Sequence, residues 1–210
     1  MTPERFLYLA ERVDLVALID SWVVTQALDL LTARADESFA VSVNLAQRSI
    51  GAPAVLDILA QRLGAATFDP RRLVLEVGER SAMASVAATQ RFLDVVASLG
   101  CSSALDDFGA GLGSLSYLKY LPFDFLKIDG AVVATCASSA VDRTLVSAIT
   151  AVAGELGKQT IAEATPDQQT LDLLRRAGVD YAQGYFVGRP QPLDAVFPIG
   201  RPAVMVPVPG

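Results

Sequence analysis

The chain has 210 residues, of which 52% are hydrophobic and 19% are charged, and its 17 basic and 23 acidic side chains give a formal net charge of −6. An apolar content this high excludes a disordered chain, and the length predicts one domain or one large part of a domain. The acidic balance argues against binding to a nucleic-acid polymer, and the absence of histidine means that any metal site is built of oxygen ligands.

Hydrophobic periodicity predicts helices and short strands in strict alternation. From Pro3 to about Ala35 the pattern is helical, and we expect two helices there. Strands are then predicted at Phe39–Leu45, Arg72–Val77, Ser103–Asp106, Phe125–Ile128, Thr160–Glu163 and Tyr181–Phe186. Helices are predicted at Pro53–Leu63, Ser81–Leu99, Gly113–Tyr120, Ala140–Leu156 and Asp167–Ala177, and a glycine stop follows four of them. This alternation predicts a mostly parallel sheet covered by helices.

Other features of the chain bear on its core and its location. Phe6, Trp22 and Phe92 lie on apolar helix faces and are expected in the core. Every apolar stretch is interrupted by a charge before the roughly 18 residues of a membrane span, and the N-terminus has no secretory signal pattern. Cys101 and Cys136 form no disulfide framework. We therefore expect a cytoplasmic protein with buried, unreactive cysteines and no membrane segment in this chain.

Polar side chains lie where each predicted strand ends. They are Asn44, Glu76, Asp106, Asp107, Lys127, Asp129, Glu163 and Gln183. Because successive side chains of a strand alternate between its faces, these groups are expected on the face opposite the bulky aliphatic residues. Asp106 and Asp107 break this parity, so both reach one site only if the chain turns there. The glycines at 109 and 111 suit such a turn.

Chemical groups at the ends of six strands favour an α/β fold of the TIM type, a (β/α) barrel whose active-site groups come from the carboxyl ends of several strands. An open, doubly wound sheet is the alternative. It would concentrate these groups at one switch point, and the usual glycine-rich phosphate-binding turn after a first strand is absent. The barrel is therefore preferred.

The strand-end groups are rich in hard oxygen donors. Mg²⁺, Mn²⁺ and Ca²⁺ prefer such ligands, which here are Asn44, Glu76, Asp106, Asp107 and Glu163. Carboxylate clusters of this kind hold one or two divalent ions that activate water and bind the phosphate of a phosphodiester, with a lysine such as Lys127 stabilising charge. Alternatively, individual residues cap helices or line the rim. That interpretation is preferred for Asp129, and for Glu79 on spacing alone.

At these same residues the sequence resembles the EAL-domain family, the cyclic-di-GMP phosphodiesterases of bacterial signalling. The most specific stretch, Asp106–Asp129, is similar to the family's DDFGTGYSSL segment and the LPVD and LKID segments that follow it. Shorter matches occur in the family's order at Val43–Leu45, Leu75–Glu79, Ile161–Glu163 and Gln183–Tyr185. The resemblance extends from Pro3 to about Pro192.

The resemblance implies a barrel that hydrolyses cyclic-di-GMP to the linear dinucleotide with two Mg²⁺ or Mn²⁺ ions. The residues that match the family's metal ligands are Asn44, Glu76, Asp106, Asp107 and Glu163. Lys127 matches the residue that holds the attacking water, and Gln183 matches a further active-site position. Glu79 matches the acid that steadies the loop after the aspartate pair. The resemblance therefore favours a functional role for Glu79 over that of an ordinary acid in the first turn of a helix.

The sequence also departs from the family pattern. Its first helix resembles the one that follows the eponymous Glu-Ala-Leu strand, so we expect that strand and its metal-binding glutamate to be missing from these residues. Pro166 replaces the second Glu of the family's EGVE run, and Ala110 and Leu112 replace Thr and Tyr in the dimer-associated loop. We therefore expect residues 1–210 to be a single EAL-type barrel domain, truncated at the N-terminus to about six strands, with a proline-rich tail at 191–210.

Three functions remain open at this point. The first is metal-dependent hydrolysis of cyclic-di-GMP, impaired in this chain because the two-metal site is weakened. The second is a degenerate module that binds nucleotide or a protein partner without catalysis, and the third is a self-associating scaffold. Unpaired strand edges favour a homodimer or a partner domain in a longer chain. The retained site residues favour the first function, while the lost ligand leaves open whether the chain is an active enzyme.

Overall fold

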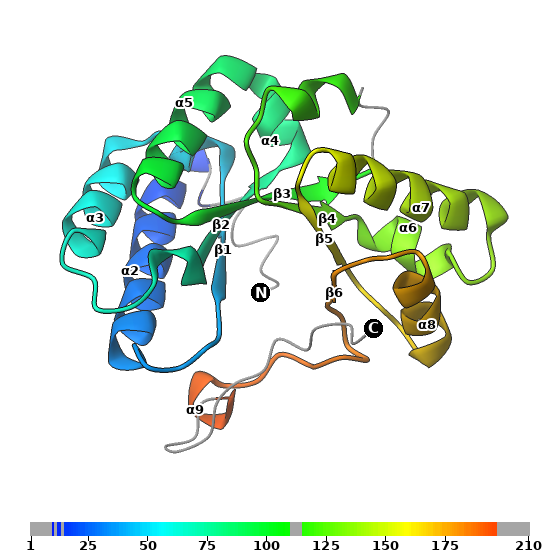
Figure 1. The fold of residues 1–210 in the computed structure, drawn as a ribbon. Coiled ribbons are helices and arrows are strands. Elements are labelled where there is room, and N and C mark those ends of the chain that lie inside the picture. The colour runs from blue at the N-terminus through cyan, green and yellow to red at the C-terminus, as the bar shows by residue number, and fades with distance from the viewer. Residues whose placement is uncertain (1–9, 11, 14, 110–114, 197–210) are drawn as a thin grey trace. The chain divides into compact units, whose positions relative to one another are not determined.

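The computed structural model describes all residues except 1–9, 11, 14, 110–114 and 197–210. The chain divides into two compact units, Met1–Ser103 and Ala104–Gly210. Figure 1 shows helices and strands alternating along the chain in both units, as the sequence predicts. The two predicted opening helices differ in outcome: the second is present, whereas the first falls largely outside the described residues.

Helices pack on a pair of parallel strands in the first unit. In chain order its elements are α2 (Val16–Ala33), β1 (Val41–Leu45), η1 (Gln47–Ser49), α3 (Pro53–Leu63), η2 (Pro70–Arg72), β2 (Leu73–Gly78), α4 (Glu79–Ala84) and α5 (Val86–Ser98). Strand β1 pairs in parallel with β2, and α3 lies in the crossover between them. Helix α2 contacts α3 and β1 (Figure 1). Burial along β1 alternates, with Val43 and Leu45 buried and Asn44 exposed, so its apolar face is covered as the period-two pattern predicts.

Helix α2 is the one helix among the described residues that is long and apolar enough to cross a membrane, with a mean hydropathy of 1.3 over 18 residues. A core helix meets the same criteria. Its Asp20 is buried and accepts a hydrogen bond from the Ala46 backbone N–H at 2.9 Å. The contacts of α2 with α3 and β1 therefore account for its buried apolar face as part of the core of the first unit.

Parallel strands also form the sheet of the second unit. Its first strand, β3 (Ser102–Phe108), begins two residues before the boundary of the unit at Ala104. The elements that follow are η3 (Leu115–Lys119), β4 (Phe125–Ile128), α6 (Gly130–Thr135), α7 (Ala140–Glu155), β5 (Gln159–Ala162), α8 (Gln168–Arg176), β6 (Tyr181–Ala182) and α9 (Leu193–Val196). Strand β4 pairs in parallel with β3 and β5, and β5 pairs in parallel with β6. Leu126, Lys127 and Ile128 are consecutive and all buried, so both faces of β4 are covered, as is usual for a strand of a parallel sheet.

Several element boundaries differ from the prediction for local reasons. The predicted helix Ser81–Leu99 is two helices, α4 and α5, because Ser85 leaves helical geometry with a φ of −155°. The predicted strand Tyr181–Phe186 ends at Ala182, shortly before Gly184 turns the chain with a φ of 151°. Helix α6 was not predicted. It begins where the Asp129 carboxylate accepts a hydrogen bond from the Ala131 backbone N–H at 2.8 Å.

Core predictions also had mixed outcomes. Phe92 is buried, as predicted, but Trp22 is 64% exposed, so its assignment to the core is wrong. Phe6 lies outside the described residues. The two cysteines are free and buried, and burial raises the pKa of the Cys101 thiol to about 12. The thiol of Cys101 therefore stays protonated near neutral pH, which agrees with the predicted lack of reactivity.

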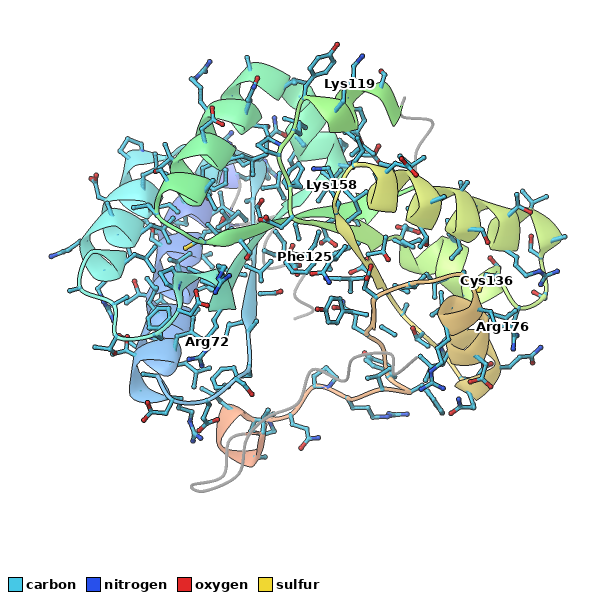
Figure 2. The ribbon with its side chains drawn as sticks, viewed as in Figure 1. Arg72, Lys119, Phe125, Cys136, Lys158 and Arg176 are labelled. Carbon is cyan, nitrogen blue, oxygen red and sulfur yellow. The ribbon has the colours of Figure 1, made fainter. Side chains whose placement is uncertain are left out.

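Arg72 joins the segment after α2 to the start of β2 (Figure 2). Its guanidinium donates three hydrogen bonds, to the carbonyl oxygens of Arg34, Ala35 and Phe39, at 3.0, 2.8 and 2.7 Å. The guanidinium carbon also lies 4.8 Å from the centroid of the Phe39 ring. A planar group with several fixed donors is needed to make all of these contacts at once.

Replacement of Arg72 by lysine should therefore lower the free energy of unfolding by about 1–3 kcal/mol, because an ammonium cannot satisfy all three carbonyls or stack on the ring. Arg71→Lys is the matched control. Arg71 pairs with Asp69 at the surface, where its side chain is 78% exposed, so that change should cost less than about 0.5 kcal/mol. Urea denaturation measures both, and equal stability of the two variants would contradict the role given to Arg72.

Candidate metal-binding site

The carboxyl end of β3 contains a β-bulge. Leu105 pairs with Leu126 and Phe108 pairs with Ile128, so β3 has one more residue than β4 between these two pairs. Asp107 lies in this stretch with a φ of 57°, in the left-handed region that aspartate tolerates better than most residues. The chain thus turns at the aspartate pair as predicted, although the turn begins at Asp107 itself rather than at the glycines that follow.

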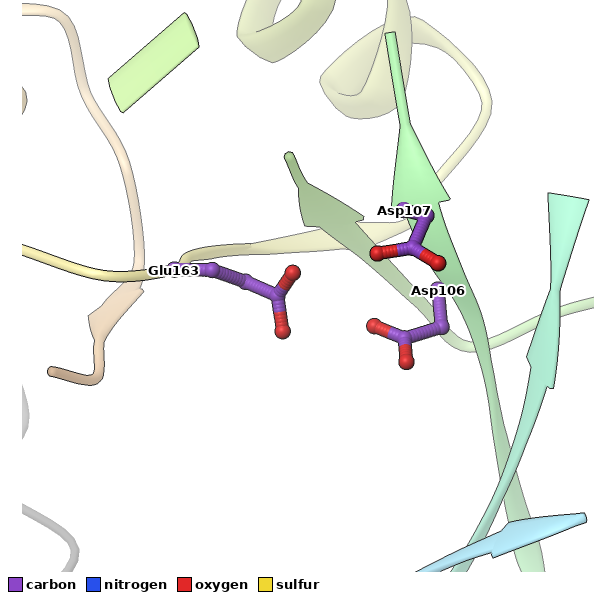
Figure 3. Close-up of side chains that lie close together, drawn as sticks. All are labelled: Asp106, Asp107 and Glu163. Carbon is purple, nitrogen blue, oxygen red and sulfur yellow. The ribbon is translucent and has the colours of Figure 1, made fainter. Parts of the chain in front are cut away.

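Three carboxylates come together at this end of the second unit. Ligand oxygens of Asp106, Asp107 and Glu163 lie within 4.8 Å of one another. Figure 3 shows the Glu163 side chain, which follows β5, extending toward the two aspartates at the end of β3. We call these three residues the carboxylate cluster.

Lys127 of β4 neutralises part of the charge of the carboxylate cluster. Its Nζ lies 2.7 Å from Asp106 Oδ1 and 2.7 Å from Glu163 Oε1, and the lysine side chain is only 3% exposed. The two carboxylates are also largely buried, with side-chain exposures of 13% and 14%. A buried ammonium requires such partners, because an unpaired charge in this position would carry a large desolvation cost.

Burial raises the pKa of Glu163 to about 7. Lys127 opposes this rise through its hydrogen bond and positive charge, whereas the neighbouring Asp106 carboxylate adds to it. One ammonium therefore leaves the carboxylate cluster with more negative charge than its surroundings stabilise. A divalent cation would supply the missing positive charge, and the hard oxygen donors match the preference of Mg²⁺ or Mn²⁺. The residues of this cluster fit such an ion.

Gln183 is the fifth predicted site residue that the second unit brings to this place. Its Nε2 donates a hydrogen bond to Glu163 Oε1 at 3.1 Å. The main chain supports this pair, because the Gln183 N–H donates to the Ala162 carbonyl at 2.8 Å and the Thr165 N–H donates to the Gln183 carbonyl at 2.9 Å. Gln183 thus contacts the same Glu163 oxygen, Oε1, that pairs with Lys127.

Close backbone packing fixes the direction of Glu163. The next residue, Ala164, has a φ of 48°, which is unfavourable for a residue with a Cβ. A Cβ on Gly130 would lie 2.7 Å from the Ala164 Cβ, and a Cβ on Gly184 would lie 2.4 Å from Thr165 N. Sequence reasoning missed these three positions, and the glycine in the family's EGVE run was the signal that position 164 adopts a left-handed conformation.

The remaining predicted ligands lie in the first unit. Asn44 of β1 and Glu76 of β2 are direct partners in the parallel ladder, so their side chains project from the same face of the sheet. Asn44 is exposed, whereas Glu76 is buried. Glu79 is the buried first residue of α4. The parity predicted for Asn44 is confirmed by the burial pattern, while Asp129 caps α6 as the alternative interpretation proposed.

Comparison with known proteins places these residues in a family context. The family profile described as "EAL domain" matches residues 1–190. The chain is 35% identical over 195 residues to a protein of Shewanella oneidensis named cyclic di-GMP phosphodiesterase PdeB, covering 92% of this chain and 23% of that protein. It is 33% identical over 197 residues to the bifunctional diguanylate cyclase/cyclic di-GMP phosphodiesterase MucR of Pseudomonas aeruginosa, covering 29% of it. The chain thus spans about a quarter of the length of these relatives.

Solved structures give the same result for the fold. The structure titled "PaMucR Phosphodiesterase, c-di-GMP complex" matches with a TM-score of 0.85 at 32% identity, over 93% of this chain and 80% of that one. The FimX EAL domain of Xanthomonas citri in complex with c-diGMP matches with a TM-score of 0.86 at 33% identity, over 92% of this chain and 77% of that one. EAL domains have a TIM-barrel fold, so the predicted α/β fold class is confirmed, with six described strands.

The contact between Gly130 and Ala164 generates a double-mutant test. Gly130→Ala should lower the free energy of unfolding by about 1–3 kcal/mol, because the new Cβ meets the Cβ of Ala164. In an Ala164→Gly background the same change should be nearly neutral, since the obstructing atom is gone and alanine favours the first turn of α6. Thermal unfolding of the four proteins measures the coupling, and an equal cost in both backgrounds would refute the steric explanation.

Proposed function

Because this chain belongs to the EAL domain family, we propose that it is the part of a bacterial signalling protein that binds cyclic-di-GMP and hydrolyses it to the linear dinucleotide. The observation that carries this proposal is the carboxylate cluster with the buried ammonium of Lys127 bridging two of its members. Relatives named cyclic di-GMP phosphodiesterases and EAL domains solved with c-di-GMP support the choice of substrate.

We propose that two Mg²⁺ or Mn²⁺ ions are held by Asn44, Glu76, Asp106, Asp107 and Glu163. When bound, divalent ions act as Lewis acids toward the phosphate. They also lower the pKa of a water molecule bound to them, so that hydroxide is available near neutral pH. The donor chemistry of the carboxylate cluster supports part of this ligand set, and the shared sheet face of Asn44 and Glu76 supports the rest. Glu79 is proposed to steady the loop that follows the aspartate pair.

The chain's own residues have distinct roles in this proposal. The Lys127 ammonium, fixed by Asp106 and Glu163, donates a hydrogen bond that orients the attacking water and stabilises negative charge on the phosphate oxygens. Gln183 donates to Glu163 and so keeps that carboxylate from rotating away. Burial of Lys127 excludes bulk water on the sheet side, which strengthens its electrostatic effect.

We propose that both compact units belong to one barrel domain, because the family profile runs through both of them. The length of the relatives supports a longer natural protein in which this domain is joined to others. A cytoplasmic location, and pairing with a second copy or a partner domain, complete the proposal.

A second function is binding of cyclic-di-GMP without hydrolysis. Pro166 favours it, because it stands where the family has the second Glu of the EGVE run and cannot act as a carboxylate. Impaired hydrolysis with retained binding is the intermediate case. The two functions differ in turnover but share the nucleotide and the residues around Glu163.

Metal binding tests the proposed ligands. Asp106→Asn and Glu163→Gln should each weaken Mn²⁺ binding by at least about tenfold, because affinity for hard ions follows the number of charged ligands. Asp129→Asn is the control, since the Asp129 carboxylate caps α6 and asparagine caps equally well. Isothermal titration calorimetry with Mn²⁺ measures all three. Unchanged affinity in Glu163→Gln would remove that residue from the ligand set.

Hydrolysis tests the proposed activity. Chromatography of cyclic-di-GMP incubated with the chain and Mn²⁺ should show the linear dinucleotide, and Lys127→Met should lower its rate of formation by about a hundredfold or more, because the fixed positive charge is lost. Asp129→Asn should remain close to the unmodified chain. Binding of cyclic-di-GMP without any cleavage would reject hydrolysis and favour the binding module.

A further inference from the structure

One face of α2 carries large apolar side chains that are open to solvent. Leu15, directly before the helix, is 47% exposed, and Leu18 and Trp22 are 62% and 64% exposed. We call these three residues the α2 stripe. Apolar side chains with half or more of their surface in water stabilise a fold little, and contiguous groups of them are typical of interaction sites. The fold of the first unit therefore leaves the α2 stripe unexplained.

Helix geometry places the α2 stripe on the side of α2 that faces away from the core. The residues of α2 that are buried include Val16, Val24 and Leu31. At about 100° per residue, Leu18 and Trp22 lie on the opposite side of the helix from them. A further strand beside β1 would extend the sheet under the buried side of α2 and would leave the stripe uncovered. Only an element that packs on the outside of α2 covers it.

The spacing of the α2 stripe suits a second helix. Leu15, Leu18 and Trp22 are three and then four residues apart, which is the spacing of the a and d positions in a coiled coil. Between Leu15 and Leu28 the one charged residue is Asp20, and it is buried. A narrow, uncharged line of this kind packs against a helix that runs alongside it.

Opposite charges lie at the two ends of the α2 stripe. Arg12 is exposed and lies in the turn before α2, where the Leu15 N–H donates to the Ala10 carbonyl at 2.9 Å. Asp29 follows Trp22 by two turns on the same side of the helix. It pairs with Arg62 of α3, yet its side chain remains 54% exposed. A second copy of α2 that runs antiparallel would match positive with negative charge at both ends.

We propose that the α2 stripe is the interface of a homodimer in which two α2 helices pack antiparallel, with Trp22 as the central anchor. This inference rests on the pairing with a second copy in the proposed function and names the surface that makes it. A two-fold axis midway between Leu18 and Val23 along the helix puts Trp22 against Ile19 of the partner subunit. Both copies then use the same residues, so each contact occurs twice. Tryptophan is the residue type that most often anchors such interfaces.

Association of the full chain tests this interface. Sedimentation velocity over a concentration series should show a dimer that dissociates on dilution, because a single pair of helices gives a small interface. Trp22 is the one tryptophan of the chain, so its fluorescence should shift to shorter wavelength as the dimer forms and the ring leaves water. Trp22→Ser should raise the dissociation constant of the dimer by at least about tenfold.

Charge exchange tests the antiparallel register. Arg12→Glu should raise the dissociation constant by about three- to tenfold, because it places like charges opposite each other at both ends of the interface. Addition of Asp29→Arg to this variant should restore most of the affinity, since the charges are opposite again. Val141→Ser is the matched control, because Val141 is 76% exposed on α7, outside the proposed interface, and its loss should leave association unchanged. Circular dichroism checks that each variant is folded.

The outcomes separate this inference from the proposed hydrolysis. A chain that is monomeric at every concentration would overturn the interface, as would a dimer that Trp22→Ser does not weaken or that Val141→Ser does. Fluorescence of a buried tryptophan in the monomer would also overturn it, because the stripe would then be covered within one chain. Trp22→Ser should bind Mn²⁺ as the unmodified chain does. Absence of hydrolysis by a dimer that depends on Trp22 would reject the proposed activity and uphold the interface.

Discussion

The ion pairs of Lys127 are the constraint on which the second unit depends. The Lys127 ammonium is buried on β4, a strand that is paired on both sides, so its anionic partners must come from the neighbouring strands. They are Asp106, in the second half of β3, and Glu163, which directly follows β5. The parallel register already brings both partners to the face of Lys127, because Leu105 pairs with Leu126 and Ile161 pairs with Lys127. The residue that follows each partner, Asp107 or Ala164, then leaves strand geometry with a positive φ.

Unusual backbone geometry is concentrated around these partners. Asp107 and Ala164 are the non-glycine residues with positive φ among those described, and Gly184 has a φ of 151°. Each non-glycine case costs on the order of 1 kcal/mol, and such strain persists only where surrounding contacts over-determine the conformation. Here the close packing of Gly130 and Gly184 on the 164–165 segment supplies those contacts. Strain and carboxylate chemistry thus occur at the same strand ends.

Much of the candidate site followed from strand periodicity. Alternation of side chains correctly placed Asn44 opposite Val43 and Leu45, because a period of two allows only two faces. The same rule identified the break at Asp106 and Asp107. The helical pattern failed for Trp22, since an apolar helix position indicates a core residue only when another element covers it, and no local pattern reports that cover. Ala164 escaped notice because single residues reveal little about φ.

The sequence by itself determined the alternation of strands and helices, the hard-donor chemistry at the strand ends and the resemblance to the EAL domain, since these depend on local periodicity and residue type. Only the tertiary structure decided that Lys127 bridges Asp106 and Glu163, that Gln183 holds Glu163, and that Gly130 must lack a side chain. These features arise from contacts between segments far apart in the chain. Their distances follow from how strands pair and pack, which no local pattern encodes.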